Sequence, residues 1–240
     1  MFLSIPLSRI SRMSNRSMST SGSLQAAAAP SSAPLQPNAA PRHRHARRDN
    51  HKPRSNVPEA EETYYVLSLQ TDPKHHQTMC ALRERYFPPA LLRVAAHISL
   101  FRALPESALP SLRTDIAAVA GRTTTFGIRA VGPPIRMGRG GVGVSVVGLE
   151  PAEGIVKELQ QKWHDVLSRQ DHGAFRGHYT LMNKVDDPEK VEKCFEEVRQ
   201  ELEPHGVPGT ALGLSLWRYD KGWWRHEHDY AFSGAGDGGQ

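Results

Sequence analysis

Two pairs of residues in this chain combine a histidine with a hydroxyl side chain two positions later. They are His97 with Ser99 and His178 with Thr180. An imidazole takes up and releases protons near neutral pH, and a hydroxyl can donate a hydrogen bond to a phosphate oxygen. Two such pairs would supply a base, an acid and two donors to an anion without any metal ion.

The residues around each pair predict a β-strand, over 95–104 and over 177–185. Alternate side chains of a strand share a face, so each histidine should point the same way as its hydroxyl partner while the apolar neighbours enter the core. A third histidine-hydroxyl pair, His76 with Thr78, lies in a predicted helix, where residues two apart do not face together. The strand context therefore singles out the first two pairs.

Helices and strands alternate through residues 63–232. The predicted strands are 64–70, 95–104, 126–131, 142–149, 177–185, 211–219 and 223–232, and the predicted helices are 73–86, 111–120, 151–163 and 188–202. This order repeats a strand, helix, strand unit, and each histidine motif lies on the third element of its unit. The repeat predicts two related lobes that face each other across a cleft.

The net charge lies almost entirely in the first 50 residues. They contain seven Arg, no Lys and one Asp, a formal charge of +6, whereas the whole chain carries +5. The remaining residues therefore sum to about −1. The high pI of the chain therefore gives no argument that the folded part is a general nucleic-acid binder, and any RNA contact must be local.

Residues 1–62 are rich in Ser, Ala, Pro and Arg, and their low apolar content predicts a disordered leader. The first twenty residues contain no acidic side chain and place Leu7, Ile10 and Met13 on one side. This pattern suits a mitochondrial presequence, with a plain disordered extension as the alternative. At the other end, residues 233–240 predict a flexible Gly-rich tail.

Cysteine usage and hydropathy give expectations about compartment. Cys80 and Cys194 fall in predicted amphipathic helices, which favours packed, reduced thiols over a disulfide. No apolar run approaches the roughly 18 residues needed to span a bilayer. We expect an intracellular, cytoplasmic monomer without membrane contact, and the leader makes a mitochondrial location the alternative.

The two motifs, in this order, resemble those of the two-histidine (2H) phosphoesterase superfamily, particularly its 2′-5′ RNA ligase-like and cyclic phosphodiesterase branch. The segments HISL at 97–100 and HYTL at 178–181 carry the resemblance, which extends over 63–232. It implies a bilobal α+β fold of two pseudo-symmetric lobes, each with an antiparallel sheet flanked by helices. Both motifs would line the central groove.

The resemblance also implies hydrolysis of 2′,3′-cyclic phosphate ends of RNA or nucleotides, without a metal or other cofactor. Of His97 and His178, one would activate water and the other would protonate the leaving oxygen, in either order. Ser99 and Thr180 would hold the non-bridging oxygens. RNA 2′-5′ ligation is a chemical near neighbour of this reaction, and a non-catalytic RNA-end or nucleotide-binding module is the alternative from another class.

Three arginines are further candidates for binding phosphate. Arg176 comes just before the second motif. Arg136 and Arg139 accompany a glycine-rich run that could form a basic loop touching RNA, although such a run more commonly forms a hairpin turn.

Aromatic and histidine side chains near the end of the chain have two interpretations. Trp223, with Tyr219 and Trp224, could stack on a nucleic-acid base, or these rings could be cross-strand packing pairs. His226 and His228 are expected to share a strand face and could bind a metal. Two ligands without a third favour an ordinary edge strand, so no metal site is predicted.

Overall fold

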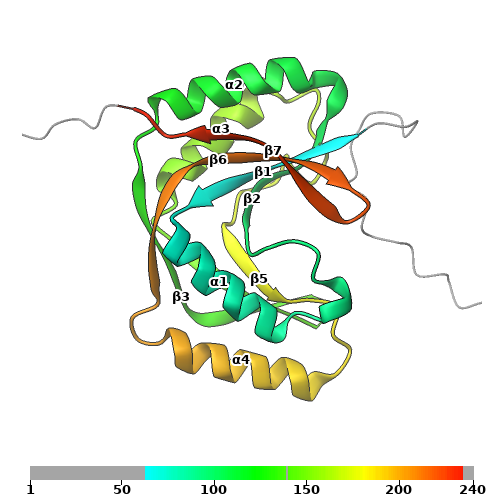
Figure 1. Cartoon of the computed structure of the whole chain (residues 1–240), viewed down its shortest axis with the longest axis vertical. Helices are drawn as coiled ribbons and strands as arrows, with labels where there is room; N and C mark the ends of the chain where they lie inside the picture. The colour runs from blue at the N-terminus through cyan, green and yellow to red at the C-terminus, as the bar shows by residue number, and fades with distance from the viewer. Residues whose placement is uncertain (1–62, 139, 235–240) are drawn as a thin grey trace, which may run out of the picture. The chain divides into compact units, whose positions relative to one another are not determined.

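The computed structural model describes residues 63–138 and 140–234. The predicted leader, Arg139 and most of the predicted tail therefore lie outside the described residues. The elements are β1 (Tyr64–Thr71), α1 (Pro73–Tyr86), η1 (Pro89–Leu91), β2 (Ile98–Pro105), η2 (Glu106–Ala108), α2 (Leu109–Arg122), β3 (Phe126–Met137), β4 (Gly141–Val147), α3 (Glu150–Lys162), β5 (His178–Met182), α4 (Pro188–Leu202), β6 (Val207–Asp220) and β7 (Trp223–Ala231) (Figure 1). The predicted order of helices and strands is confirmed.

The described strands form one antiparallel sheet in the order β2-β1-β6-β3-β4-β5, and β7 pairs with β6. The predicted α+β class, with antiparallel strands and flanking helices, is confirmed. The two expected lobes share this sheet instead of having one each, because the long strand β6 belongs to both halves. Its residues 207–211 pair with β3 and its residues 211–218 pair with β1. Pseudo-two-fold symmetry of the lobes stays a prediction.

Several strand boundaries differ from the prediction, among them the start of β2, the end of β3, the end of β5 and the start of β6. β2 begins at Ile98, so His97 lies one residue before the strand. β3 continues to Met137, because after an irregularity between Val131 and Ile135 it pairs with β4 again at Ile135, Arg136 and Met137, up to the hairpin turn. Gly140 in that turn has φ +60°, and a Cβ there would lie 1.7 Å from the carbonyl oxygen of Val185, so the position requires glycine. The hairpin interpretation of the glycine-rich run is confirmed.

Helix α1 is held to the sheet at its first turn. The Asp72 carboxylate accepts the N–H of His75 at 3.0 Å as an N-cap, and the N–H of Thr210 in β6 at 2.7 Å. The buried His75 ring donates from Nδ1 to the Pro208 carbonyl at 3.1 Å, and its Nε2 accepts from the Tyr179 hydroxyl of β5 at 3.1 Å. These contacts join α1 to both β6 and β5.

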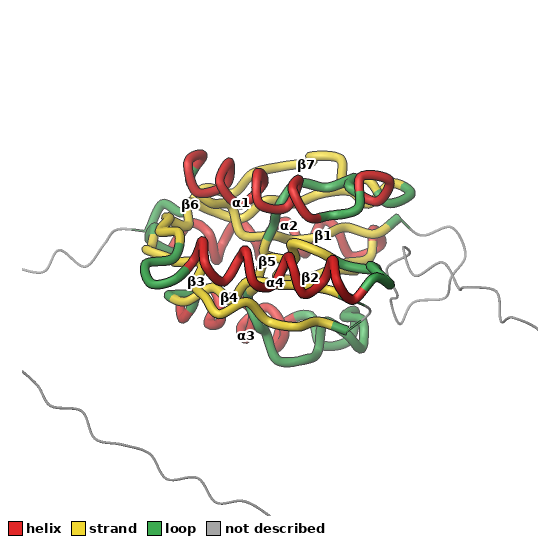
Figure 2. The backbone as a smooth tube through the Cα atoms, turned by 90° about the horizontal axis from the view of Figure 1, so that it is seen from below, coloured by secondary structure: helices red, strands yellow, loops and turns green. Residues whose placement is uncertain are grey.

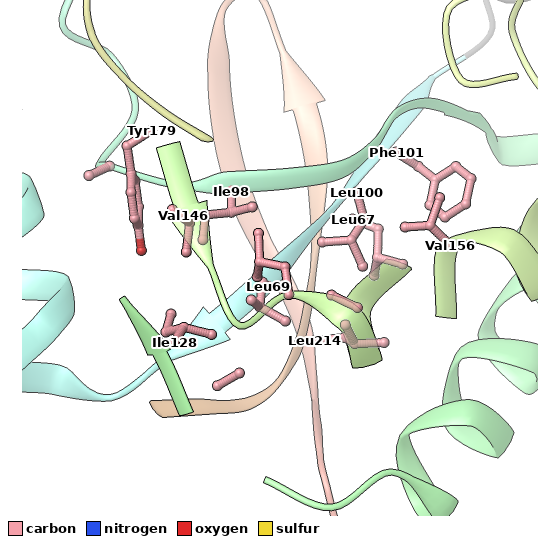
Figure 3. Close-up of a cluster of buried hydrophobic side chains, with 14 of the residues drawn as sticks. Leu67, Leu69, Ile98, Leu100, Phe101, Ile128, Val146, Val156, Tyr179 and Leu214 are labelled. Carbon is pink, nitrogen blue, oxygen red and sulfur yellow. The ribbon is translucent and has the colours of Figure 1, made fainter. Parts of the chain in front are cut away.

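Apolar side chains fill the space between the strands and the helices. In Figure 2, α1 lies above the strands and α3 lies below them. Figure 3 shows part of the core, in which Leu67 and Leu69 of β1 gather with Ile98 and Leu100 of β2 and Leu214 of β6. Cys80 and Cys194 are both free thiols, as predicted. Within residues 63–138 and 140–234, no helix has the length and apolar character needed to cross a membrane.

Candidate active site

Both histidine motifs show the alternation expected of a strand. The side chains that enter the core are almost fully buried, and those expected to face the groove are half-buried. The buried set is Ile98, Leu100, Tyr179 and Leu181, and the half-buried set is His97, Ser99, His178 and Thr180. Within the motifs, chemistry-bearing residues and core residues therefore face opposite ways.

The curvature of the sheet brings the two motifs together. β2 and β5 are the two end strands of the path through the sheet. They nevertheless contact each other, beside the β6–β7 hairpin (Figure 1). His178 is near enough to His97 for its positive charge to lower the pKa of His97. The two motifs, 81 residues apart in sequence, thus lie close together in the fold.

Both imidazoles are anchored to the backbone in the same way. Nδ1 of His97 donates to the carbonyl oxygen of Ala95 at 2.7 Å, and Nδ1 of His178 donates to that of Arg176 at 2.8 Å. A carbonyl oxygen only accepts, so the hydrogen of each neutral ring lies on Nδ1. Each histidine therefore keeps Nε2 as the nitrogen that can exchange a proton with a substrate.

The surroundings of His97 favour its neutral form. The Trp224 ring lies over it, with 4.2 Å between the ring centroids. The pKa of His97 is lowered to about 3, chiefly by burial of the imidazole and also by the positive charges of Arg83, Arg102 and His178, against the opposing effect of the Ala95 hydrogen bond. His97 is therefore unprotonated at neutral pH.

The β6–β7 hairpin reaches His97 because its tip is attached to the segment before β2. Nη1 of Arg93 donates to the Lys221 carbonyl at 2.9 Å. The next residue, Gly222, has φ +95°, and a Cβ there would lie 2.8 Å from the Arg93 guanidinium. At this position the hairpin presents Trp224 to His97 and leaves Trp223 46% exposed.

The model of the 2′-5′ RNA ligase superfamily matches residues 71–223, a stretch that contains both motifs. The chain belongs to this superfamily. Its resemblance to the 2H phosphoesterases, noted from the motifs, is confirmed. A search of curated proteins finds no match.

Solved structures are similar to this superfamily member at low identity. TT0787 of Thermus thermophilus is 16% identical, with a TM-score of 0.48 over 72% of this chain and 98% of that one. E. coli LigT complexed with 3′-AMP is 14% identical, with a TM-score of 0.46 over 72% and 99%. Usb1 of Kluyveromyces marxianus is 14% identical, with a TM-score of 0.34 over 65% and 92%.

The three arginines predicted to bind phosphate differ in their surroundings. Arg176 is exposed, and its carbonyl oxygen anchors His178. Arg136 lies within β3 instead of in the glycine-rich turn, where we expected it. Its Nη2 is 2.6 Å from a carboxylate oxygen of Glu192, and its guanidinium lies 4.2 Å from the centre of the Phe195 ring, so α4 holds it. Arg139 lies outside the described residues.

The prediction that His226 and His228 share a strand face is wrong. An irregularity in β7 leaves His226 opposite Trp217 and His228 opposite Leu216, and these neighbours on β6 face opposite ways. The His226 ring packs against Trp217, and the His228 ring packs against Tyr230. In the part of the chain that the structure describes, no group of three or more His, Cys, Asp or Glu is placed to hold a metal ion.

Ser99 is one of three serines aligned across neighbouring strands. In the sheet register Ser68 of β1 lies opposite both Ser99 of β2 and Ser215 of β6. Nε1 of Trp217 donates to the Ser68 hydroxyl at 2.8 Å, and the Ser215 hydroxyl donates to a carboxylate oxygen of Asp229 at 2.6 Å. The face of the sheet that carries Ser99 is thus polar under the hairpin.

Two residues that the motifs did not reveal connect the site. Arg83, on the buried face of α1, donates to the backbone of both motif segments. The Asp171 carboxylate, in the segment between α3 and β5, accepts the N–H groups of Arg102 and Ala103 in β2 at 3.0 Å each. An arginine among the apolar positions of a predicted helix is a signal that could have pointed to Arg83, whereas nothing local distinguishes Asp171.

Proposed function

We propose that the chain opens 2′,3′-cyclic phosphate ends of RNA or nucleotides by acid–base catalysis between two histidines. Membership of the 2′-5′ RNA ligase superfamily supports phosphoester chemistry. The observation that carries the proposal is the matched anchoring of His97 and His178, which leaves one Nε2 just before β2 and one on β5, two strands that contact each other.

In-line attack on phosphorus needs a proton acceptor on one side and a proton donor on the other. Nε2 of His97 would remove a proton from water as the water oxygen bonds to phosphorus. The bond to the leaving ribose oxygen would break as Nε2–H of protonated His178 gives that oxygen its proton. The lowered pKa of His97 supports its role as the base.

Ser99 and Thr180 would donate to the non-bridging oxygens, because each shares a face with its histidine. The Thr180 hydroxyl is 3.9 Å from the sulfur of Met137, a weak acceptor that a phosphate oxygen would readily replace. Donors aimed at developing charge are the strongest single contribution in many such sites. Arg176 would add an exposed cation beside the site, and Trp223 an exposed ring for a base.

The test is turnover of an oligonucleotide with a 2′,3′-cyclic phosphate end in the presence of EDTA. His97→Ala and His178→Ala should each lower kcat by about 10²- to 10⁴-fold. His76→Ala is the matched control, because His76 also precedes a hydroxyl by two residues but lies exposed on α1. It should behave as wild type.

Other outcomes separate the alternatives. Unchanged turnover in both motif variants would reject the acid–base assignment. Binding of the oligonucleotide without turnover by the wild type would favour a non-catalytic module. A second reaction, with a 5′-hydroxyl RNA added, would reveal ligation as a longer product with a 2′-5′ linkage.

A further inference from the structure

The last turn of α1 buries an arginine that has no carboxylate partner among residues 63–138 and 140–234. Arg83 is only 6% exposed. Burial lowers the pKa of its guanidinium to about 10, and the nearby Cys80 thiol opposes that effect only in part. A buried charge without a counter-charge destabilises a fold, so its presence calls for a compensating role.

The Arg83 guanidinium joins the two motif segments to each other. Its Nε donates to the carbonyl oxygen of Val94, three residues before His97, at 3.1 Å. Its Nη1 donates to the carbonyl oxygen of Thr180, in the second motif. The planar fork of an arginine can satisfy two acceptors in a fixed relative position, which a lysine ammonium does not reproduce.

The position of Arg83 is set by rigid neighbours. Asp72 and His75 attach the first turn of α1 to β6 and β5. At the other end of the helix, the Arg83 guanidinium lies over the Phe87 ring, 3.8 Å from its centre. The guanidinium is thus held by a helix that cannot shift without moving several buried hydrogen bonds.

We propose that Arg83 is a positioning residue that fixes the separation of the two motif strands and supplies the positive counter-charge for a phosphate bound between them. The inference rests on the proposed function. An acid and a base that act on opposite sides of one phosphorus require a constant separation. Arg83 is also near enough to lower the pKa of His97, together with Arg102 and His178, so a phosphate at His97 would lie in the same field.

Two variants separate the hydrogen bonds of Arg83 to both motif segments from its positive charge, and a third variant is the control. Arg83→Met removes the hydrogen bonds and the charge, whereas Arg83→Lys keeps the charge but not the planar guanidinium. Arg85→Met is the matched control, since Arg85 lies two residues further on the same helix and pairs at the surface with Glu201. Thermal unfolding of each variant checks that it folds. If Arg83→Met does not fold, Arg83→Lys still tests the role of the two hydrogen bonds.

Three properties of the folded variants are then measured: kcat, the affinity for inorganic phosphate and the pKa of His97. Arg83→Met and Arg83→Lys should lower kcat by about 10- to 100-fold, because a displacement of about 1 Å in the site has that effect. Affinity for inorganic phosphate, measured by calorimetry, should fall about tenfold in Arg83→Met and much less in Arg83→Lys. The pKa of His97, followed by NMR titration of its ring, should rise in Arg83→Met only.

The inference would be overturned if kcat, phosphate affinity and the pKa of His97 all kept their wild-type values in Arg83→Met. A wild-type kcat in Arg83→Lys would overturn it as well. Phosphate affinity and the pKa of His97 do not depend on turnover. The wild type could therefore be inactive while Arg83→Met still changes the phosphate affinity and the pKa of His97. That result would contradict the proposed reaction but support the charge effect assigned to Arg83. An active wild type whose Arg83 variants match it would contradict Arg83 alone.

Discussion

His97 lies under the Trp224 ring and close to two arginines, whereas among the described residues no aromatic ring packs against His178. The anchor is nevertheless the same on both sides, a carbonyl oxygen two residues before the histidine. The anchor determines which nitrogen carries the hydrogen of the neutral ring, and the surroundings affect how readily that ring takes up a second proton. Two similar motifs can therefore differ in their chemistry.

The largest effect that could sharpen this comparison concerns the hydroxyls. Ser99→Ala and Thr180→Ala should each lower kcat by about 10²-fold, because each removes one donor to the phosphate oxygens. Ser99→Thr and Thr180→Ser keep the hydroxyl and should stay within a few-fold of wild type. Steady-state kinetics with a cyclic phosphate substrate measures all four. A loss confined to one side would show that the phosphate is held from that side alone.

The next effect tests whether the two sides are mechanically joined. Asp171→Asn should lower the free energy of unfolding by about 1–3 kcal/mol, since an amide cannot accept from both buried N–H groups of β2. Asp165→Asn is the control, because that carboxylate is exposed. Urea unfolding measures both. Equal stabilities would mean that Asp171 does not hold β2.

A third prediction concerns the Trp224 ring, which packs against His97. Trp224→Leu should raise the pKa of His97, because the imidazole regains water. The acid limb of kcat/KM, which lies well below pH 6.5 in the wild type if His97 is the base, should then move to higher pH. Trp223→Leu should weaken oligonucleotide binding without moving the limb. A limb that stays in place in Trp224→Leu would remove the distinction between the two histidines.

A fourth prediction concerns how the stability of the fold depends on pH. The folded chain keeps His97 neutral down to about pH 3, while the unfolded chain takes up that proton near the ordinary value of 6.5. The unfolded state thus binds more protons between these values, and the free energy of unfolding should fall as the pH falls from 6.5 toward 3. His97→Gln should flatten this dependence in urea titrations. A dependence in His97→Gln as steep as that of the wild type would contradict the lowered pKa of His97.

The sequence alone was enough for the local part of this picture. Strand alternation placed His97 and Ser99 on one face, and helix geometry set His76 aside, because both depend only on neighbouring residues. The shared sheet was not predictable in this way, since β6 pairs with strands from both halves of the chain. Trp224 reaches His97 from a hairpin, and Arg83 reaches the backbone of both motif segments from a helix, and both positions depend on tertiary packing. The surroundings that lower the pKa of His97 were therefore also hidden.

The contacts of Arg83 and Asp171 have a consequence for self-association. β2 and β5 end the path of paired strands, and backbone groups at such ends readily pair with strands of other molecules. Here Arg83 occupies the carbonyl oxygens of Val94 and Thr180, and Asp171 occupies two N–H groups of β2. These contacts thus leave fewer backbone groups near the two end strands with which a strand of another molecule could pair.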